Sequence, residues 1–258
     1  MNLSILRAAP RSGIAWLSLL LAAVPAAAQD APDVQTIVDR ASAAAYYRGA
    51  DGKAEVHMSI VDAQDRERTR DFVILRHDVA DADNGEQRFY VYFQKPADVS
   101  RTVFMVWKHV DRGDDRWLYL PSLDLVKRIA PSDERTSFVG SHFFYEDVSG
   151  RGPTEDTHSL VEVTDNYFVV DSVPKDSSGV EFARYRNYIH KSTFIPVKTE
   201  YYDGRETLYR TYEAVKVDVV QGFPTVVESR MTDLATGGST TLTYTSVAYD
   251  LGLPEDIF

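Results

Sequence analysis

The sequence lacks cysteine altogether among its 258 residues. This absence excludes a disulfide framework, and it leaves no thiol that could carry a lipid anchor. The apolar run from Ile14 to Val24 is too short for a comfortable membrane span. There is also no internal repeat, no low-complexity tract and no linker rich in Pro, Gly or Ser. We therefore expect one continuous domain without a stable membrane anchor.

Positive charge is also in short supply. Lys and Arg together number 28 against 39 Asp and Glu, so the formal net charge is −11. Such a balance repels nucleic acid and anionic lipid head groups at long range, which argues against a nucleic-acid partner. It suits a shuttle that should not adhere to bilayers, although acidity that serves only solubility explains it as well.

The first 28 residues have the pattern of an export signal. Arg7 and Arg11 precede the apolar run, and Ala26-Ala27-Ala28 provides small residues for cleavage. We expect cleavage after Ala28, which leaves residues 29–258 as a single mature domain. The signal is typical of a Gram-negative periplasmic protein.

The rest of the chain predicts one long helix and many strands. Apolar residues recur at helical spacing after Pro32, and Gly49 ends the pattern, which predicts a helix over 33–48. From Lys53 onward the apolar period changes to two, and Asn84-Gly85 is a strong hairpin signal. The predicted strands are 53–60, 66–77, 87–94, 101–108, 116–120, 123–129, 159–164, 167–173, 180–190, 196–202, 207–217, 225–232 and 240–247.

Several of these strands are apolar on both faces, notably 72–75, 89–93 and 103–107. One helix of about sixteen residues cannot cover a sheet of this width. The sheet must therefore either fill its own interior or curl around a cavity. The pattern alone leaves these two alternatives open.

The stretch 116–150 carries a family resemblance. It reads RWLYLPSLDLVKRIAPSDERTSFVGSHFFYEDVSG and combines a β-hairpin with a loop whose tip is aromatic. It resembles the periplasmic outer-membrane lipoprotein-sorting proteins, relatives of the carrier LolA, and the likeness extends more loosely over 51–258. The resemblance implies a mainly β fold with few helices: a curved antiparallel sheet, or incomplete barrel, of about 10–12 strands. An N-terminal helix and a lid segment would enclose an apolar cavity.

On this reading, large side chains on the apolar strands and on the lid bind the guest. The predicted cavity and lid residues are Phe72, Ile74, Phe89, Val91, Phe93, Phe104, Val106, Trp117, Tyr119, Phe138, Phe143, Phe144 and Tyr145. Arg184 and Arg186 share one face of a predicted strand and are candidates for contact with a lipid head group. Ordinary ion pairs with the many acids are the alternative for these two arginines.

The lid also invites a catalytic interpretation, because His142, Glu146 and Asp147 lie close together in sequence. No G-x-S-x-G or H-E-x-x-H spacing is present, so a lipid hydrolase is the less favoured hypothesis. The acidic residues around Asn84-Gly85 do not match a calcium-binding loop. We expect no enzyme, no cofactor and no metal site.

The favoured hypothesis is a periplasmic carrier that binds the acyl chains of a lipid or lipoprotein and passes them towards the outer membrane. Its partners would be those acyl chains, an upstream exporter and an outer-membrane acceptor. Proteins that resemble this group are often associated with inner-membrane exporters of the RND type. A docking or handover subunit of such an exporter is therefore the second hypothesis.

Overall fold

The computed structural model describes residues 31–80, 83–130, 133, 136–177 and 181–258. The chain divides into two units, Met1–Ala31 and Pro32–Phe258, and the fold described below is that of the second unit. The predicted signal sequence, residues 1–28, lies outside the described residues. No helix in the described part of the chain is long and apolar enough to cross a bilayer.

Helix α1 (Val34–Tyr46) lies within the predicted range 33–48 and ends two residues before the predicted end. Asp33 is its N-cap, and the Asp33 carboxylate accepts a hydrogen bond from the Thr36 backbone N–H at 3.0 Å. Ile37, Ala41 and Ala44 form its buried face. This face packs against Phe168, Val170, Ile189, Phe194 and Ile195 of the sheet described below and one of its turns.

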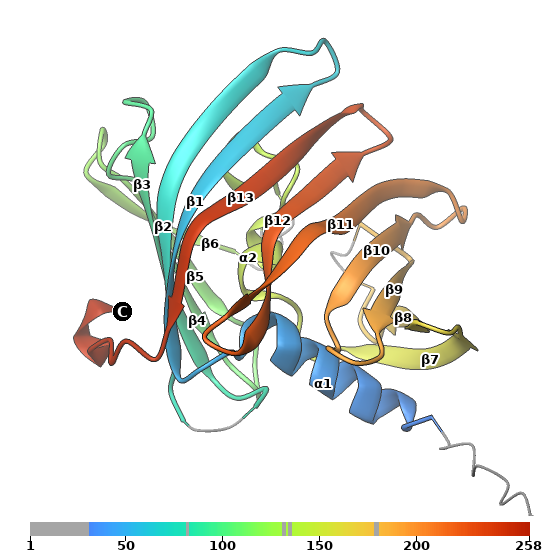
Figure 1. Cartoon of the computed structure of the whole chain (residues 1–258). Helices are drawn as coiled ribbons and strands as arrows, with labels where there is room; N and C mark the ends of the chain where they lie inside the picture. The colour runs from blue at the N-terminus through green and yellow to red at the C-terminus, as the bar shows by residue number, and fades with distance from the viewer. Residues whose placement is uncertain (1–30, 81–82, 131–132, 134–135, 178–180) are drawn as a thin grey trace, which may run out of the picture. The chain divides into compact units, whose positions relative to one another are not determined.

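The described residues form one antiparallel sheet of thirteen strands, one more than the upper end of the predicted range. Figure 1 shows its elements in chain order. The strands are β1 (Asp51–Asp62), β2 (Glu67–Asp78), β3 (Gln87–Lys95), β4 (Val103–Lys108), β5 (Asp115–Leu120), β6 (Leu125–Ile129), β7 (Asp156–Val163), β8 (Tyr167–Pro174), β9 (Arg184–His190), β10 (Pro196–Tyr202), β11 (Leu208–Val220), β12 (Phe223–Asp233) and β13 (Gly238–Tyr249).

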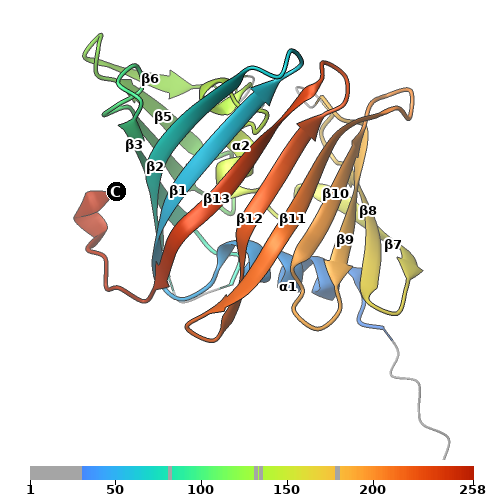
Figure 2. The ribbon, with the colours of Figure 1, turned by 45° about the horizontal axis from the view of Figure 1, so that its top comes forward.

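The strand order explains where the sheet is open. Strands pair with their sequence neighbours except that β1 pairs with β13, so the order runs from β6 through β1 and β13 to β7. Figure 2 shows this curved, continuous surface. The two edge strands, β6 and β7, are consecutive in sequence, so their connection must pass from one edge of the sheet to the other. That connection contains the short helices η2 (Phe138–Gly140) and α2 (Tyr145–Ser149).

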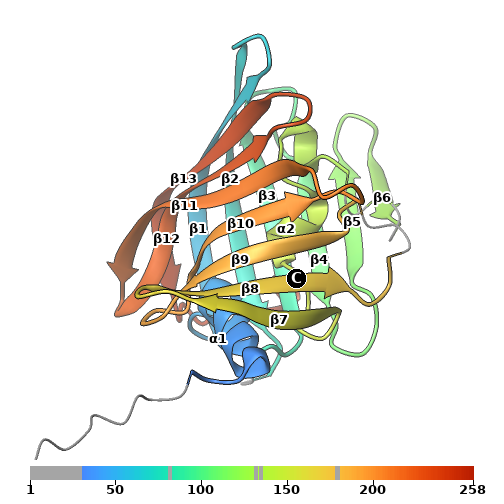
Figure 3. The same ribbon diagram turned by 90° about the vertical axis from the view of Figure 1, so that its right-hand side faces the viewer.

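Two apolar clusters cover different parts of the concave face. In one, Phe138, Phe143 and Tyr145 of the β6–β7 connection pack on strands β1 to β4 and on β12 and β13. In the other, α1 packs on β8, β9 and the β9–β10 turn. Figure 3 shows α2 between the two arms of the sheet and α1 at one end. The lone long helix thus covers one arm, and the connection, which we call the lid (residues 136–155), covers the other.

Candidate functional site: a lidded cavity

The concave face encloses a cavity of about 390 Å³. Its walls come from α1, from the lid, and from strands β1–β3 and β9–β13. This volume lies within the range of roughly 300–1,000 Å³ that small-molecule sites occupy. The lining is mainly apolar, with polar groups at a few positions.

The lid is held over the cavity by aromatic packing. The Phe138 ring centroid lies 5.5 Å from that of Phe104, 5.7 Å from Phe93 and 6.3 Å from Phe72. Tyr145 lies 5.0 Å from Phe104, also between centroids. Edge-to-face and tilted pairs of this kind contribute beyond the area they bury, at about 0.5–1.5 kcal/mol each.

The predicted guest-binding residues separate into three groups. Six line the cavity: Phe72, Ile74, Phe89, Val91, Phe138 and Phe143. Four lie in the apolar packing behind that surface: Phe93, Phe104, Val106 and Tyr145. The remaining three make other contacts: Trp117, Tyr119 and Phe144.

Trp117 and Tyr119 lie on the opposite face of the sheet from the cavity. Trp117 pairs in register with Met105, whereas the inward-facing Phe104 pairs with Leu118. The Trp117 ring packs edge-on against Trp107 at 5.4 Å, and the Tyr119 hydroxyl donates to Asp124 at 3.1 Å. Because strand residues alternate between faces, Leu118 is the residue of β5 that packs on the lid cluster.

A buried arginine anchors the start of α2. Arg210 of β11 is paired with the Asp147 carboxylate, which also accepts a hydrogen bond from the Phe144 backbone N–H at 2.7 Å. The Arg210 guanidinium lies 3.9 Å from the Phe144 ring centroid and 4.7 Å from that of Tyr201. Burial raises the pKa of Asp147, and the Arg210 charge opposes that rise.

A second arginine anchors the end of α2. Arg151 pairs with Glu146 at 2.6 Å and with Asp156 of β7 at 2.7 Å. Asp156 also accepts a hydrogen bond of 2.6 Å from the Tyr185 hydroxyl of β9. The Asp156 side chain is fully buried, so these contacts fix the lid to the β7 edge.

The contacts of the lid also account for His142, Glu146 and Asp147, the residues for which the sequence allows a catalytic interpretation. Glu146 and Asp147 are bound to different arginines, and the His142 ring lies 2.8 Å from the Thr240 hydroxyl of β13. The Asp147 and His142 contacts fasten the lid to the sheet directly, and Glu146 does so through Arg151, which also pairs with Asp156 of β7. No metal-binding group of three or more His, Cys, Asp or Glu side chains occurs within the part of the chain that the structure describes.

The two arginines considered for a head group, Arg184 and Arg186, lie on β9 away from the cavity lining. Arg186 donates a bidentate pair of hydrogen bonds to the Asp171 carboxylate, at 2.6 and 2.9 Å. Arg184 pairs with Glu206 at 2.7 Å and stacks on the Tyr202 ring at 3.7 Å. Both are therefore engaged in ion pairs, Arg186 with a residue of β8 and Arg184 with a residue of the β10–β11 turn.

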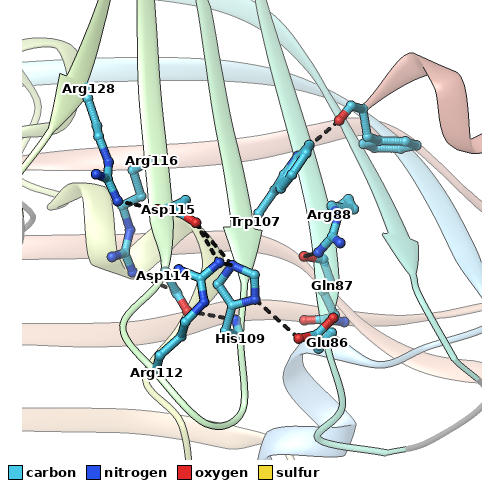
Figure 4. A network of polar contacts seen from close by, with 11 residues as sticks. Glu86, Gln87, Arg88, Trp107, His109, Arg112, Asp114, Asp115, Arg116 and Arg128 are labelled. Atoms are coloured by element: carbon cyan, nitrogen blue, oxygen red, sulfur yellow. Dashed lines mark hydrogen bonds and ion pairs between the residues drawn. The ribbon is translucent and has the colours of Figure 1, made fainter.

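The acidic turn between β4 and β5 is also a structural network (Figure 4). Asp115 accepts hydrogen bonds from Arg128 and from His109, the latter at 3.2 Å. The other ring nitrogen of His109 lies 3.1 Å from Glu86. These contacts join β3, β4, β5 and β6 at the sheet edge where the lid begins.

The cavity also contains tyrosines that sequence reasoning did not select. The six that line it are Tyr46, Tyr185, Tyr201, Tyr212, Tyr244 and Tyr249. Burial raises the pKa of Tyr244 to about 12 and raises that of Tyr46, Tyr201 and Tyr212 as well, so these hydroxyls remain neutral donors. Strand alternation places Tyr201 with Thr199, and helical spacing places Tyr46 with Ser42, but only the fold brings these elements together.

Comparison with known proteins finds one matching family model and several solved structures with a similar fold. A family model described as "Uncharacterized protein" matches residues 85–258, more than half of the chain. A DUF1329 family protein from Desulfovibrio piger shares 25% identity, with a TM-score of 0.79 over 87% of this chain and 95% of that one. A domain assigned as an outer membrane lipoprotein-sorting protein, from Vibrio parahaemolyticus, shares 26% identity, with a TM-score of 0.77 over 86% and 94%.

A LolA superfamily protein from Nitrosomonas europaea has the same fold at 20% identity, with a TM-score of 0.67 over 88% of this chain and 98% of that one. A search of curated protein sequences gave no match.

Proposed function

We propose, on the premise that this chain belongs to the LolA-like lipoprotein-sorting group, that it is a periplasmic carrier of acyl chains. The carrier would hold the chains of a lipid or lipoprotein in the lidded cavity and pass them towards the outer membrane. The observation that carries this proposal is the cavity of about 390 Å³ between the concave face and the lid. Phe72, Ile74, Phe89 and Val91 would form the wall that receives the guest.

The energetics explain the need for a carrier. Exposing a methylene group to water costs about 0.8 kcal/mol, so a chain of roughly fifteen carbons costs on the order of 12 kcal/mol. A cavity lined by Phe, Ile, Val and Met side chains offsets much of this cost. Met58 and Met231, which both line the cavity, are suited to guests of variable shape because their side chains are flexible.

The lid supplies a route for entry and release. It is joined to the two sheet edges at its ends. Between them it is held by the packing of Phe138 and Tyr145 and by polar contacts with Arg210, Asp156 and Thr240 of the sheet. Breaking a few such contacts is easier than separating strands of a continuous sheet. In the proposal, the lid swings while the thirteen-stranded wall keeps its shape.

The address and the partners are part of the same proposal. Cleavage after Ala28 would release residues 29–258 into the periplasm as one domain. A passive pocket cannot give direction to transport, so an upstream source must load it and a tighter acceptor must unload it. An RND-type inner-membrane exporter and an outer-membrane acceptor fill these two roles in the proposal.

Native mass spectrometry of protein purified from periplasm without detergent tests the carrier function. We expect a population heavier than residues 29–258 by the mass of an acyl lipid, and recovery of that lipid on organic extraction. The test variant is Ile74→Trp, in which a larger side chain fills part of the cavity. Its matched control is Tyr90→Trp, on the outer face of β3. Lipid-free protein in both the wild type and the outer-face variant, together with no uptake of added lipid, would contradict the proposal.

A further inference from the structure

The polar groups inside the cavity show what kind of head group its guest carries. Five cationic side chains line the cavity: Arg48, Lys53, Arg76, Arg151 and Arg210. An anionic head group, such as a phosphate, needs at least one of them to be available. Whether any is available can be decided from their contacts.

Each of these cations already has partners. Arg210 and Arg151 are paired with the carboxylates of the lid. Arg76 donates to the backbone carbonyls of Arg48 and Gly49, both at 2.7 Å, and to that of Tyr46. Arg48 donates to the carbonyls of Ala44 and Thr193, and Lys53 pairs with Glu55 at 3.2 Å. The cavity therefore has no spare cation among the described residues.

The hydroxyl groups in the cavity differ from the cations, because only some of them have a hydrogen-bond partner. Of its six tyrosines, Tyr185 donates to Asp156, and Tyr249 lies 3.0 Å from the Thr225 hydroxyl. Tyr212 and Tyr244 both interact with Ser229. The hydroxyls of Tyr46 and Tyr201 make no hydrogen bond with the described residues, and both remain accessible from the cavity.

A third unpartnered hydroxyl lies beside them. The Ser42 hydroxyl is buried without a hydrogen-bond partner, and Ser42 lines the cavity. Ser42 and Tyr46 are four residues apart on α1, so they are neighbours on one face of the helix. Tyr201 lines the same cavity, and burial together with the nearby Asp147 carboxylate raises the pKa of both phenols.

A guest that displaces water from the cavity leaves such a donor unmet, at a cost in free energy, unless the guest itself supplies an acceptor. An acceptor that needs no cation is an uncharged oxygen, and the oxygen that acyl lipids offer next to their chains is the carbonyl of the ester or amide linkage. We infer that Tyr46 and Tyr201, with Ser42, form a recognition site for the carbonyl oxygens of an acyl ester or amide. This inference rests on the proposed function, because it assumes that an acyl chain occupies the cavity.

The location fits this role. The Tyr46 ring lies against Gly150 at the end of α2, where a methyl group added to the glycine would come within 2.5 Å of the ring. The Tyr201 ring lies under the Arg210 guanidinium. Both phenols are therefore held in place by contacts with the lid or with the arginine that anchors it. Binding of a carbonyl to these phenols would thus affect the seating of the lid.

Displacement of the neutral dye N-phenyl-1-naphthylamine tests the inference with three competitors of one chain length. These are monopalmitoylglycerol, which has an ester; hexadecylglycerol, which has an ether; and palmitoyl lysophosphatidic acid, which adds a phosphate. We expect the ester to bind the wild type about 5- to 50-fold more tightly than the ether, since each hydrogen bond contributes about 2- to 10-fold. The phosphate should add no further affinity.

The double variant Tyr46→Phe/Tyr201→Phe keeps both rings and removes both hydroxyls. It should bind the ether as the wild type does and lose the preference for the ester. Tyr90→Phe, on the outer face of β3, should change neither affinity. Equal binding of ester and ether by the wild type, tighter binding of the phosphate compound, or an ester preference that persists in the double variant would overturn the inference alone. Failure of all three lipids to displace the dye would overturn the carrier function as well.

Discussion

At the scale of single residues, Gly150 and Asp147 decide how the lid is seated. Gly150 ends α2 with φ 70° and ψ 163°, a region that only glycine adopts readily. Asp147 holds both the first turn of α2 and Arg210. Neither role can be inferred from the sequence pattern. Asp147 pairs with a residue more than sixty positions away, and Gly150 packs against the Tyr46 ring of α1.

The variant Gly150→Ala should destabilise the protein by about 2–4 kcal/mol, because strained backbone and a clash add together. The new methyl group would lie 2.5 Å from atoms of the Tyr46 ring, so α1 or α2 must move. Urea denaturation followed by circular dichroism measures the loss. Gly113→Ala is the control, because nothing lies within 4 Å of that position; equal stability of the two variants would refute the packing of Tyr46 on Gly150.

The variant Asp147→Asn should cost about 3 kcal/mol, near the lower end for breaking a buried ion pair, because Asp147 is partly accessible. It leaves the Arg210 charge buried without a carboxylate. Adding Arg210→Met should recover much of that loss. Asp218→Asn, at an exposed pair with Lys216 of 3.9 Å, should change the free energy of unfolding by less than about 0.5 kcal/mol; a similar small effect at Asp147 would show that the pair does not hold the lid.

At the scale of elements, the lid and α1 divide the work of covering the sheet. The sequence predicts that one helix is insufficient, and the two separate apolar clusters show the reason: α1 packs on the arm of β7 to β9, with further contacts to β10 and β12. The other arm is covered by the aromatic residues of the lid. The lid in turn is fastened to β13 through His142 and Thr240.

That fastening predicts a pH dependence. Burial lowers the pKa of His142 from its ordinary value of 6.5, and the Arg68 charge adds to the effect while Asp233 opposes it. The unfolded chain therefore takes up the proton more readily than the folded one, so the free energy of unfolding falls as the pH falls below about 6.5. The variant His142→Gln should show a flatter profile between about pH 7 and 5 in urea denaturation. An unchanged slope would mean that this histidine does not couple the lid to acidity.

At the scale of the whole second unit, the strand order makes the lid unavoidable. A meander whose first and last strands in space, β6 and β7, are consecutive in sequence has to send their connection from one edge of the sheet to the other, and here the connection packs on the concave side. The sheet stays open between those edges, and the connection becomes the cover of the cavity. The wall and the lid are thus one continuous piece of chain.

This arrangement predicts that locking the lid stops exchange of the guest. The chain has no cysteine, so the double variant His142→Cys/Thr240→Cys has one possible intramolecular disulfide, between lid and β13. In the oxidised form we expect release of a preloaded fluorescent fatty ester to slow at least about tenfold, with recovery on reduction. The single variants serve as controls. Equal release rates in the oxidised and reduced forms would argue that the guest leaves by another route.

Most of the fold and part of the site are already determined by the sequence. Alternation of apolar residues predicts the strands, because burial on one face requires a period of two. The aromatic cluster 138–145 predicts the lid, and its adjacent polar residues leave the catalytic reading open. For β2 to β5, which carry apolar residues on both faces, the pattern cannot say which face is inward, and at β5 the inward residue is Leu118 and not Trp117 or Tyr119.

Only the tertiary structure decides which side chains meet. The pairing of β1 with β13 brings the two halves of the chain into one wall, and the lid crosses between its edges. Arg210 then meets Asp147, and Tyr46 and Tyr201 come to line one cavity, across sequence distances that no local periodicity spans. The physical reason is that local pattern specifies which face of an element is apolar, whereas contacts between elements depend on strand order and on the path of the connection.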